Sequence, residues 1–312
     1  MKKLRLHIYI IIGVFLTTFI LGSFLDLSIN QALFSNKNGF GLTISAIGTI
    51  PGYGCFALMG GMLIAIGLHQ FNKTFQKVIA FVCAVVAIGL GTYFSGREFF
   101  GPNGFTNSSL MWLGYLIGFV IMLGIAYLGY RLGKASDNKF LWVLLLILAI
   151  AYFLALIPGV TALKSIFHRP RYRLLATEEA QAAGLYFHNW WNRCGDYKSY
   201  MTTLDVTSEE FKSFPSGHAG ASMVMTLTVA FLPLVNRKYE KLQLPLFYVG
   251  LAWALFVSFT RMLVGAHFLS DVSMGALLTS IMLLIANEVV IHNKWLQNYL
   301  NPETNIPQEE AK

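Results

Sequence analysis

Charged residues are scarce in this sequence. Only 12% of its 312 residues are Asp, Glu, Lys or Arg, whereas a soluble globular domain carries about 25%. Hydrophobic residues make up 55% of the chain, and its mean hydropathy is +0.58. This composition excludes an ordinary soluble domain and predicts an integral membrane protein.

Cysteine is also rare. The chain has three cysteines, Cys55, Cys83 and Cys194, whose spacing fits neither a CxxC pair nor a metal-ligand pattern. Cys55 and Cys83 lie within apolar runs, where a thiol packs like a small hydrophobic side chain, and Cys194 stands alone in a polar loop. We therefore expect neither a disulfide framework nor a cysteine-bound metal.

Long apolar runs are what the sequence does contain. The hydrocarbon core of a bilayer, about 30 Å thick, requires about 20 apolar residues per helix, and lipid obliges the backbone to satisfy its own hydrogen bonds. The sequence therefore predicts an all-α, polytopic membrane bundle of about eight transmembrane helices. The predicted helices are 7–25, 52–69, 77–96, 110–131, 140–158, 217–235, 245–263 and 268–291.

The first apolar run follows Met1-Lys2-Lys3-Leu4-Arg5, an arrangement that also suits a signal peptide. No clear small-residue cleavage site follows this run. We therefore expect it to be a retained membrane anchor.

Lysine and arginine are distributed unevenly between the short loops, a bias that sets membrane orientation. The N-terminal segment and every second loop after it are basic, whereas the first two loops on the other side contain only Lys37 and Arg97. We therefore expect eight helices with both termini in the cytoplasm. The basic residues on the expected cytoplasmic side are Lys2, Lys3, Arg5, Lys73, Lys77, Arg131, Lys134, Lys139, Arg237, Lys238, Lys241 and Lys294.

One predicted outer loop, residues 159–216, breaks this bias because it is rich in cations. We expect these cations to bind an anion, and we expect Trp190 and Trp191 to anchor the loop at the lipid head groups. The first outer loop, residues 26–50, has no motif that indicates a function. The cations of the 159–216 loop are Lys164, Arg169, Arg171, Arg173, Arg193, Lys198 and Lys212.

Histidine and aspartate stand at two ends of apolar runs, where ionisable groups are costly and are therefore functional candidates. His267 and Asp271 are four residues apart and share one helix face, so the carboxylate can fix the tautomer of the imidazole. His218 follows Pro215-Ser216-Gly217 at a helix start, where free amides and the helix dipole favour an anion. Each segment alone also fits a helix-capping turn.

Three cations near these segments favour a functional site over a simple helix-capping turn. Lys164 and Arg171 lie just beyond the fifth run, and Arg261 closes the seventh. Together with the histidines and the aspartate they provide an oxyanion site, a nucleophile and an acid, as phosphoryl transfer requires. Two histidines and a carboxylate are also a metal-ligand set, but the cations would repel a divalent ion. We expect no metal and no cofactor.

The same residues resemble the type 2 phosphatidic acid phosphatase family, which shares its site with vanadium haloperoxidases. That family has the motifs Lys-x6-Arg-Pro, Pro-Ser-Gly-His and Ser-Arg-x5-His-x3-Asp. The matching segments here, in the same order, are Lys164-x6-Arg171, Pro215-Ser216-Gly217-His218 and Arg261-x5-His267-x3-Asp271.

Two positions depart from the family pattern. Tyr172 stands where the first motif has proline, and Thr260 stands where the third has serine, which preserves a hydroxyl. Arg169-Pro170 offers an alternative match, but it shortens the spacing from Lys164 to four residues. We assign the motif arginine to Arg171 and keep Arg169 as the alternative.

The resemblance implies a role for each matching residue. His267 is implied to be the nucleophile that becomes a phosphohistidine, Asp271 to orient it, and His218 to protonate the leaving group. No metal is implied. The phosphate is implied to contact Lys164, Arg171, Arg261, Ser216 and the amide of Gly217.

The resemblance also implies a division of the chain. Residues 1–139 would be N-terminal membrane helices, 140–291 the phosphatase core with its outer loop 159–216, and 292–312 a cytoplasmic tail. The tail from residue 301 onward is polar, and we expect it to be disordered. Four helices before the core are two more than the family usually has.

The expected protein is therefore a multi-pass phosphatase of a bacterial plasma membrane with an extracytoplasmic active site. Its expected substrate is a lipid phosphate or pyrophosphate, such as undecaprenyl pyrophosphate, phosphatidylglycerol phosphate or phosphatidic acid. A lipid-linked phosphotransferase and a non-catalytic protein that binds or transports a lipid anion are the alternatives. We expect no nucleic-acid partner, and the sequence leaves the oligomeric state open.

Overall fold

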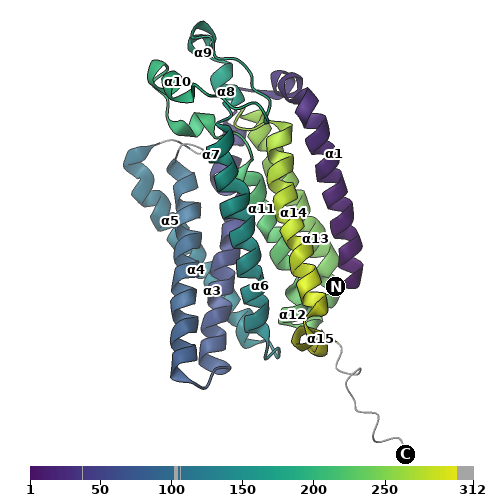
Figure 1. The fold of residues 1–312 in the computed structure, drawn as a ribbon. Coiled ribbons are helices and arrows are strands. Elements are labelled where there is room, and N and C mark those ends of the chain that lie inside the picture. Colours follow the sequence, from purple (N-terminus) through teal and green to yellow (C-terminus); the bar gives the residue numbers. More distant parts are fainter. Residues whose placement is uncertain (37, 102–104, 106, 301–312) are drawn as a thin grey trace, which may run out of the picture.

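The structure is a computed structural model that describes residues 1–36, 38–101, 105 and 107–300. Lys37 and the tail 301–312, predicted to be disordered, lie outside the described residues. Every regular element within the described ranges is helical (Figure 1). The longer elements are α1 (Lys2–Leu33), α2 (Gly39–Ile47), α3 (Ile50–His69), α4 (Thr74–Phe100), α5 (Met111–Lys134), α6 (Leu141–Leu154), η2 (Ala155–Ala162), α11 (Gly217–Val229), α13 (Gln243–Leu263) and α14 (Leu269–His292). The shorter elements are η1 (Ser108–Leu110), α7 (Leu163–Phe167), α8 (Tyr172–Leu175), α9 (Glu178–Ala182), α10 (Tyr197–Thr203), η3 (Ser208–Phe211), α12 (Leu232–Val235), η4 (Arg237–Leu242) and α15 (Lys294–Leu300).

Within the described part of the chain, seven helical segments are long and apolar enough to cross a membrane. The eighth predicted run, 217–235, instead forms α11 and α12, which are separated by a turn at Ala230 and Phe231. Neither of these two helices has the length of a bilayer-spanning helix. The seven segments are Lys2–Leu33, Gly39–His69, Thr74–Phe100, Ser108–Lys134, Leu141–Leu175, Arg237–Leu263 and Leu269–His292.

The helices form two groups that meet at α11 (Figure 1). The first group is α3 packed against α4 and α5, and the second contains α6, α13 and α14. Helix α11 contacts α3, α13 and α14, while α1 runs along α14 at the edge of the bundle. The N terminus and α15 lie at one end of the bundle, and α8, α9 and α10 cover the opposite end. We call this second end, formed by residues 168–216, the loop end.

The surface of the bundle is apolar around its sides. Large side chains such as Phe24, Val85 and Trp112 are 79%, 71% and 64% exposed. In water so many exposed apolar groups would be unfavourable, but in lipid they need no cover. The protein is therefore a multi-pass membrane protein.

Small residues bring the helices into close contact. A Cβ atom on Gly52 of α3 would lie 1.9 Å from the carbonyl oxygen of Ala221 in α11, and one on Gly61 would lie 1.8 Å from that of Ala126 in α5. Both distances are impossible for a real side chain, so glycine is required. Close backbone approach is a usual basis of helix association in lipid, where no hydrophobic force drives it.

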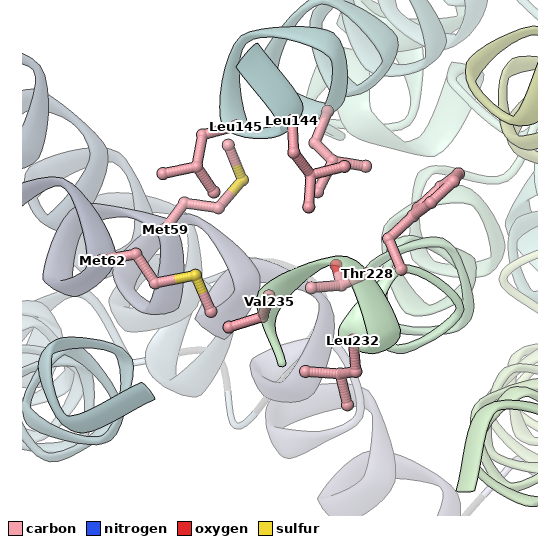
Figure 2. Close-up of a pocket in the computed structure, with 9 residues that line it drawn as sticks. Met59, Met62, Leu144, Leu145, Thr228, Leu232 and Val235 are labelled. Atoms are coloured by element: carbon pink, nitrogen blue, oxygen red, sulfur yellow. The ribbon is translucent and has the colours of Figure 1, made fainter. Parts of the chain in front are cut away.

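Side chains of α11 and α12 pack closely against α3 and α6. Figure 2 shows the small gap that is left, with side chains such as Met59 and Leu145 pointing into it. The gap has a volume of about 10 Å³, close to the least space that a water molecule occupies. Its lining is apolar except for Thr228, whose hydroxyl is hydrogen-bonded to Tyr152. This gap is therefore too small to hold a ligand.

The fifth predicted helix is longer than expected. It was predicted to end at residue 158, but the chain stays helical through η2 and α7 as far as Phe167. Pro158 lies inside η2, a π-helical segment, and such a wider turn accommodates the missing N–H of proline. The outer loop therefore begins at His168, which has the left-handed conformation with φ of 45°. The extension carries Lys164 on a helix instead of a loop.

The predicted loop 26–50 is also largely helical. Helix α1 continues to Leu33, and α2 occupies Gly39–Ile47. This correction places Asp26 on α1 and Ser45 on α2, and both side chains are buried.

Candidate active site

A cavity of about 1010 Å³ lies between α3, α4 and α6 and ends among charged residues at the loop end. Apolar side chains line most of its length. Val86 on α4 and Phe153 on α6 are lining residues that are 54% and 60% exposed, so the cavity opens sideways between these helices toward lipid. Five of the predicted site residues line its polar end: Lys164, Arg171, Gly217, His218 and His267.

His267 lies in the short connection between α13 and α14 and is 1% exposed. Its Nδ1 atom is 2.6 Å from the carbonyl oxygen of Ser213 and 3.8 Å from Oδ2 of Asp271. Because a carbonyl only accepts, Nδ1 carries the hydrogen and Nε2 carries the lone pair. Burial holds the pKa of His267 well below its usual value. A neutral imidazole with its lone pair on Nε2 is the form that a nucleophile requires.

Asp271 lies in the first turn of α14 and is fully buried. Its carboxylate accepts hydrogen bonds from the amide of Phe268 at 2.8 Å and from the hydroxyl of Ser213. It also accepts one from Nη1 of Arg169 at 2.6 Å. Asp271 therefore fixes the segment that presents the Ser213 carbonyl to His267.

Arg169 bridges two buried carboxylates. While Nη1 contacts Asp271, Nη2 is 2.9 Å from Oδ2 of Asp26 on α1. Asp26 also accepts a hydrogen bond from the amide of Ser270 at 2.9 Å and another from its hydroxyl. Arg169 does not line the cavity, whereas Arg171 does. Of the two arginines weighed for phosphate binding, Arg171 is the one placed to contact a ligand in the cavity.

His218 is the second residue of α11 and is 5% exposed. Its Nε2 atom is 3.0 Å from the carbonyl oxygen of Ser45 and 3.5 Å from Oε2 of Glu98. Nε2 therefore carries a hydrogen, since the carbonyl can only accept. The imidazole is held by α2 and α4, two helices that the sequence motifs do not include.

The cations at the polar end are partly neutralised by Glu209. Its carboxylate is 2.9 Å from Nζ of Lys212, 3.7 Å from Arg97 and 3.8 Å from Arg171. Burial opposes ionisation of this carboxylate, but the hydrogen bond and the three cations lower the pKa of Glu209 below its usual value. Lys164 on α7 donates to the carbonyl oxygen of Lys212 at 2.5 Å. The polar end thus presents positive charge together with an ionised carboxylate.

Two predicted phosphate contacts lie behind the cavity wall. Arg261 is 0% exposed and donates a hydrogen bond to the hydroxyl of Ser45. The hydroxyl of Ser216 caps α11 by accepting from the amide of Ala219 at 3.3 Å. Neither side chain lines the cavity, so the structure does not bring them together with Lys164 and Arg171 on its surface.

Comparison with known families gives one match. A family model described as the PAP2 superfamily matches residues 140–295, which is half of the chain. The chain belongs to the PAP2 superfamily. No curated protein and no solved structure matched the chain. Together with the apolar helices, the match identifies a membrane protein of a phosphatase superfamily.

The PAP2 match begins at Phe140 and therefore leaves out α1 to α5. Three buried groups of these helices nevertheless reach the site: Asp26, the backbone and side chain of Ser45, and Glu98. These groups could not be identified from the sequence, because each belongs to a segment without a motif and its partner at the site is 120 residues or more away in the chain. The one available signal was a carboxylate at the end of an apolar run.

The aromatic pair of the outer loop is placed differently from the prediction. Trp190 stacks on Phe214 with a ring-centroid distance of 5.3 Å, and its Nε1 donates to the hydroxyl of Ser23 at 2.9 Å. It therefore packs the loop onto α1 and the segment before α11. Trp191 is 48% exposed and is the one of the two that is free to meet lipid head groups.

Proposed function

We propose that this PAP2 protein is a metal-independent phosphatase that hydrolyses a lipid phosphate or pyrophosphate through a phosphohistidine. The observation that carries the proposal is the position of the two histidines and the cations at the polar end of a cavity that opens sideways to lipid. A small soluble phosphate ester would not fill the apolar part of this cavity. A lipid can place its phosphate among the charges and its chain along the apolar wall.

The length of the cavity supports a long-chain substrate. Its lining on α4 runs from Ile79 to Glu98, which corresponds to about 29 Å at a rise of about 1.5 Å per residue. That length approaches the full thickness of the bilayer core, about 30 Å. Undecaprenyl pyrophosphate, phosphatidylglycerol phosphate and phosphatidic acid are the candidate substrates, and the long lining favours the longest chain.

In the first step of the proposed reaction, Nε2 of His267 attacks the phosphorus atom. The bond between phosphorus and the leaving oxygen breaks, and His218 donates a proton to that oxygen. Lys164 and Arg171 stabilise the negative charge that spreads over the other phosphate oxygens. Asp271 and the Ser213 carbonyl keep the hydrogen of His267 on Nδ1.

In the second step, a water molecule attacks the phosphohistidine from the side of the departed product. His218, now neutral, takes a proton from this water, and the bond between phosphorus and Nε2 breaks. Inorganic phosphate leaves, and both histidines return to their starting states. A sugar or lipid hydroxyl in place of this water would make the protein a phosphotransferase.

We place the loop end on the extracytoplasmic side of a bacterial plasma membrane. The support is the distribution of basic residues, which gather at the opposite end of the bundle, as in Lys2, Arg5, Lys134 and Arg237. Residues 1–139 and 140–291 are proposed as the N-terminal and catalytic parts, although both contribute to the site. In the predicted tail, residues 294–300 form α15, which packs its buried Leu296 against the bundle.

Phosphate release by detergent-purified protein in EDTA tests the proposed function. The three candidate lipids are offered side by side, and a variant that lacks the His267 imidazole serves as the blank. We expect release that is unaffected by EDTA and absent in the blank. Release abolished by EDTA would point to a metal site, and transfer to an added acceptor without hydrolysis would identify a phosphotransferase.

The long cavity makes a prediction about chain length. Ala87 lines the cavity on α4, and tryptophan at this position would fill its middle. We expect Ala87→Trp to raise KM for a long-chain polyprenyl phosphate by about tenfold, because losing about 1.4 kcal/mol of binding changes an equilibrium tenfold. A short-chain substrate that does not reach Ala87 should be unaffected.

Val85 provides the matched control, because it lies on the same helix but is 71% exposed and does not line the cavity. Val85→Trp should leave KM for both chain lengths unchanged. Equal effects of Ala87→Trp on long and short chains would show that the chain does not lie along this wall.

A further inference from the structure

Glu98 near the end of α4 faces the active site from outside the matched PAP2 region. It is 9% exposed, it lines the large cavity, and its Oε2 atom is 3.5 Å from Nε2 of His218. A carboxylate in this position is costly in two ways. It is removed from water near the end of an apolar helix, and it repels the phosphate that the neighbouring cations attract.

His218 is surrounded by groups of both signs: α13 and the segment before α8 contribute positive charges, and α4 contributes a negative charge. Burial is the largest influence that disfavours a charged imidazole, and the positive charges of Arg261 on α13 and of Arg171 in the segment before α8 add to it. Helix α2 contributes the carbonyl oxygen of Ser45, and the connection before α14 contributes the imidazole of His267. Glu98 supplies negative charge next to the Nε2–H group. It is therefore placed to favour the protonated ring against two arginines.

The position of Glu98 resembles that of the carboxylate in a Ser-His-Asp triad. In such a triad the carboxylate accepts a hydrogen bond from one ring nitrogen and stabilises the imidazolium, while the other nitrogen exchanges the proton of the reaction. The separation of 3.5 Å is long for a hydrogen bond, but catalytic hydrogen bonds often shorten only when substrate is bound.

We propose that Glu98 is a positioning residue that keeps His218 protonated so that it can deliver a proton to the leaving oxygen. This inference rests on the proposed phosphatase mechanism. The Nε2–H group stays on the Ser45 carbonyl and the Glu98 carboxylate, and the proton on Nδ1 goes to the leaving oxygen as its bond to phosphorus breaks. The water that attacks next returns a proton to Nδ1. Helix α4 thereby contributes to catalysis as well as to the wall of the cavity.

A comparison of leaving groups tests this role. An alkoxide requires a proton in order to leave, whereas 4-nitrophenolate leaves without one. We expect Glu98→Gln to lower kcat/KM for a long-chain alkyl phosphate by about 10²-fold or more, the usual size of general-acid catalysis. For 4-nitrophenyl phosphate we expect less than about a threefold change, because its first step needs no acid. The parameter kcat/KM is used because it reports the step in which the leaving group departs.

Glu209→Gln is the matched control, since it removes another cavity carboxylate whose partners are cations instead of a histidine. It should change kcat/KM for the two substrates by the same factor. A parallel loss for both substrates in Glu98→Gln would overturn the proposal and make Glu98 a counter-ion of the arginines. The ratio of the two kcat/KM values does not depend on how much of the preparation is folded.

Two further measurements distinguish a failure of the Glu98 proposal from a failure of folding or of the proposed function. If Glu98→Gln yields no folded protein, Glu98→Asp preserves the charge at a shorter reach and should shift the ratio in the same direction, by less. An unchanged ratio in Glu98→Asp, with lower activity toward both substrates, would overturn the proposal. Wild-type protein that hydrolyses neither substrate, or whose activity survives loss of the His267 imidazole, would instead refute the proposed function.

Discussion

Replacing His267 by alanine is expected to lower kcat by roughly 10⁴–10⁶-fold, the range found when one member of a nucleophile–base unit is removed. The imidazole is buried, neutral and held with its lone pair on Nε2 by the Ser213 carbonyl, and no nearby group can replace it as the nucleophile of the proposed reaction. Phosphate release from the preferred lipid, measured in EDTA, gives the value. Activity within tenfold of the wild type would show that phosphohistidine formation is not part of the reaction.

His218→Asn is the control that separates the two histidines. With 4-nitrophenyl phosphate the first step needs no acid, so His267 should still be phosphorylated and release a burst of one nitrophenolate per active site. Hydrolysis then lacks its base, and the phosphoenzyme should accumulate. His267→Ala should give no burst and no acid-labile phosphoprotein. The same loss of burst in both variants would mean that the two residues do not have separate roles.

Replacing Arg169 by methionine is expected to lower the free energy of unfolding by about 3–5 kcal/mol, as breaking a buried ion pair does. The guanidinium is 1% exposed and contacts Asp26 and Asp271, which are equally buried. It also lies 4.1 Å from the ring centroid of Phe268. Methionine fills much of the volume but leaves two carboxylates without their cation. Unfolding in mixed micelles measures the loss.

Arg5→Met provides the comparison for Arg169→Met. Arg5 pairs with Glu288, but the two side chains are 36% and 33% exposed, and such a pair contributes about 0–1 kcal/mol. Adding Asp26→Asn to Arg169→Met should recover part of the lost stability, because one buried charge is then gone. Equal losses for Arg5→Met and Arg169→Met would contradict the account of a buried charge network.

Five of the residues predicted from the motifs line the same cavity, whereas Ser216 and Arg261 do not line it. Four of these lining residues come from four separate segments of the chain: Lys164, Arg171, His218 and His267. Spacing could predict this, because each motif marks a helix end and the alternation of loops places these ends on one side. It could also favour Arg171 over Arg169, but it could not reveal that Arg169 binds Asp26 and Asp271.

The supporting groups could not be predicted in the same way. Asp26 and Ser45 fell in a segment interpreted as a loop, because neither hydropathy nor a motif marked it as part of the site. Glu98 stood at the end of an apolar run and had no partner within reach in the sequence. Contacts of this kind depend on how the helices pack in three dimensions, and they cannot be derived from the sequence alone.

Helix boundaries show the same limit. The fifth apolar run ends at residue 158, but the π-helical turn that contains Pro158 lets the chain stay helical to Phe167. The run 217–235 had the length of a membrane helix, but it is interrupted at Ala230 and continues in α12 with Pro233 in its first turn. Hydropathy averages over such local changes, which are decided by individual backbone hydrogen bonds.

The bridge between Asp26 and Arg169 has a consequence for the synthesis of the protein. The two residues are 143 positions apart, so at about 5–20 residues per second the ribosome makes Arg169 roughly 7–29 s after Asp26. During that interval the first helix carries a carboxylate that has no cation to neutralise it. Only when the later helices arrive can this helix settle in its final place along α14. The candidate site therefore cannot be completed before nearly all of the chain has entered the bilayer.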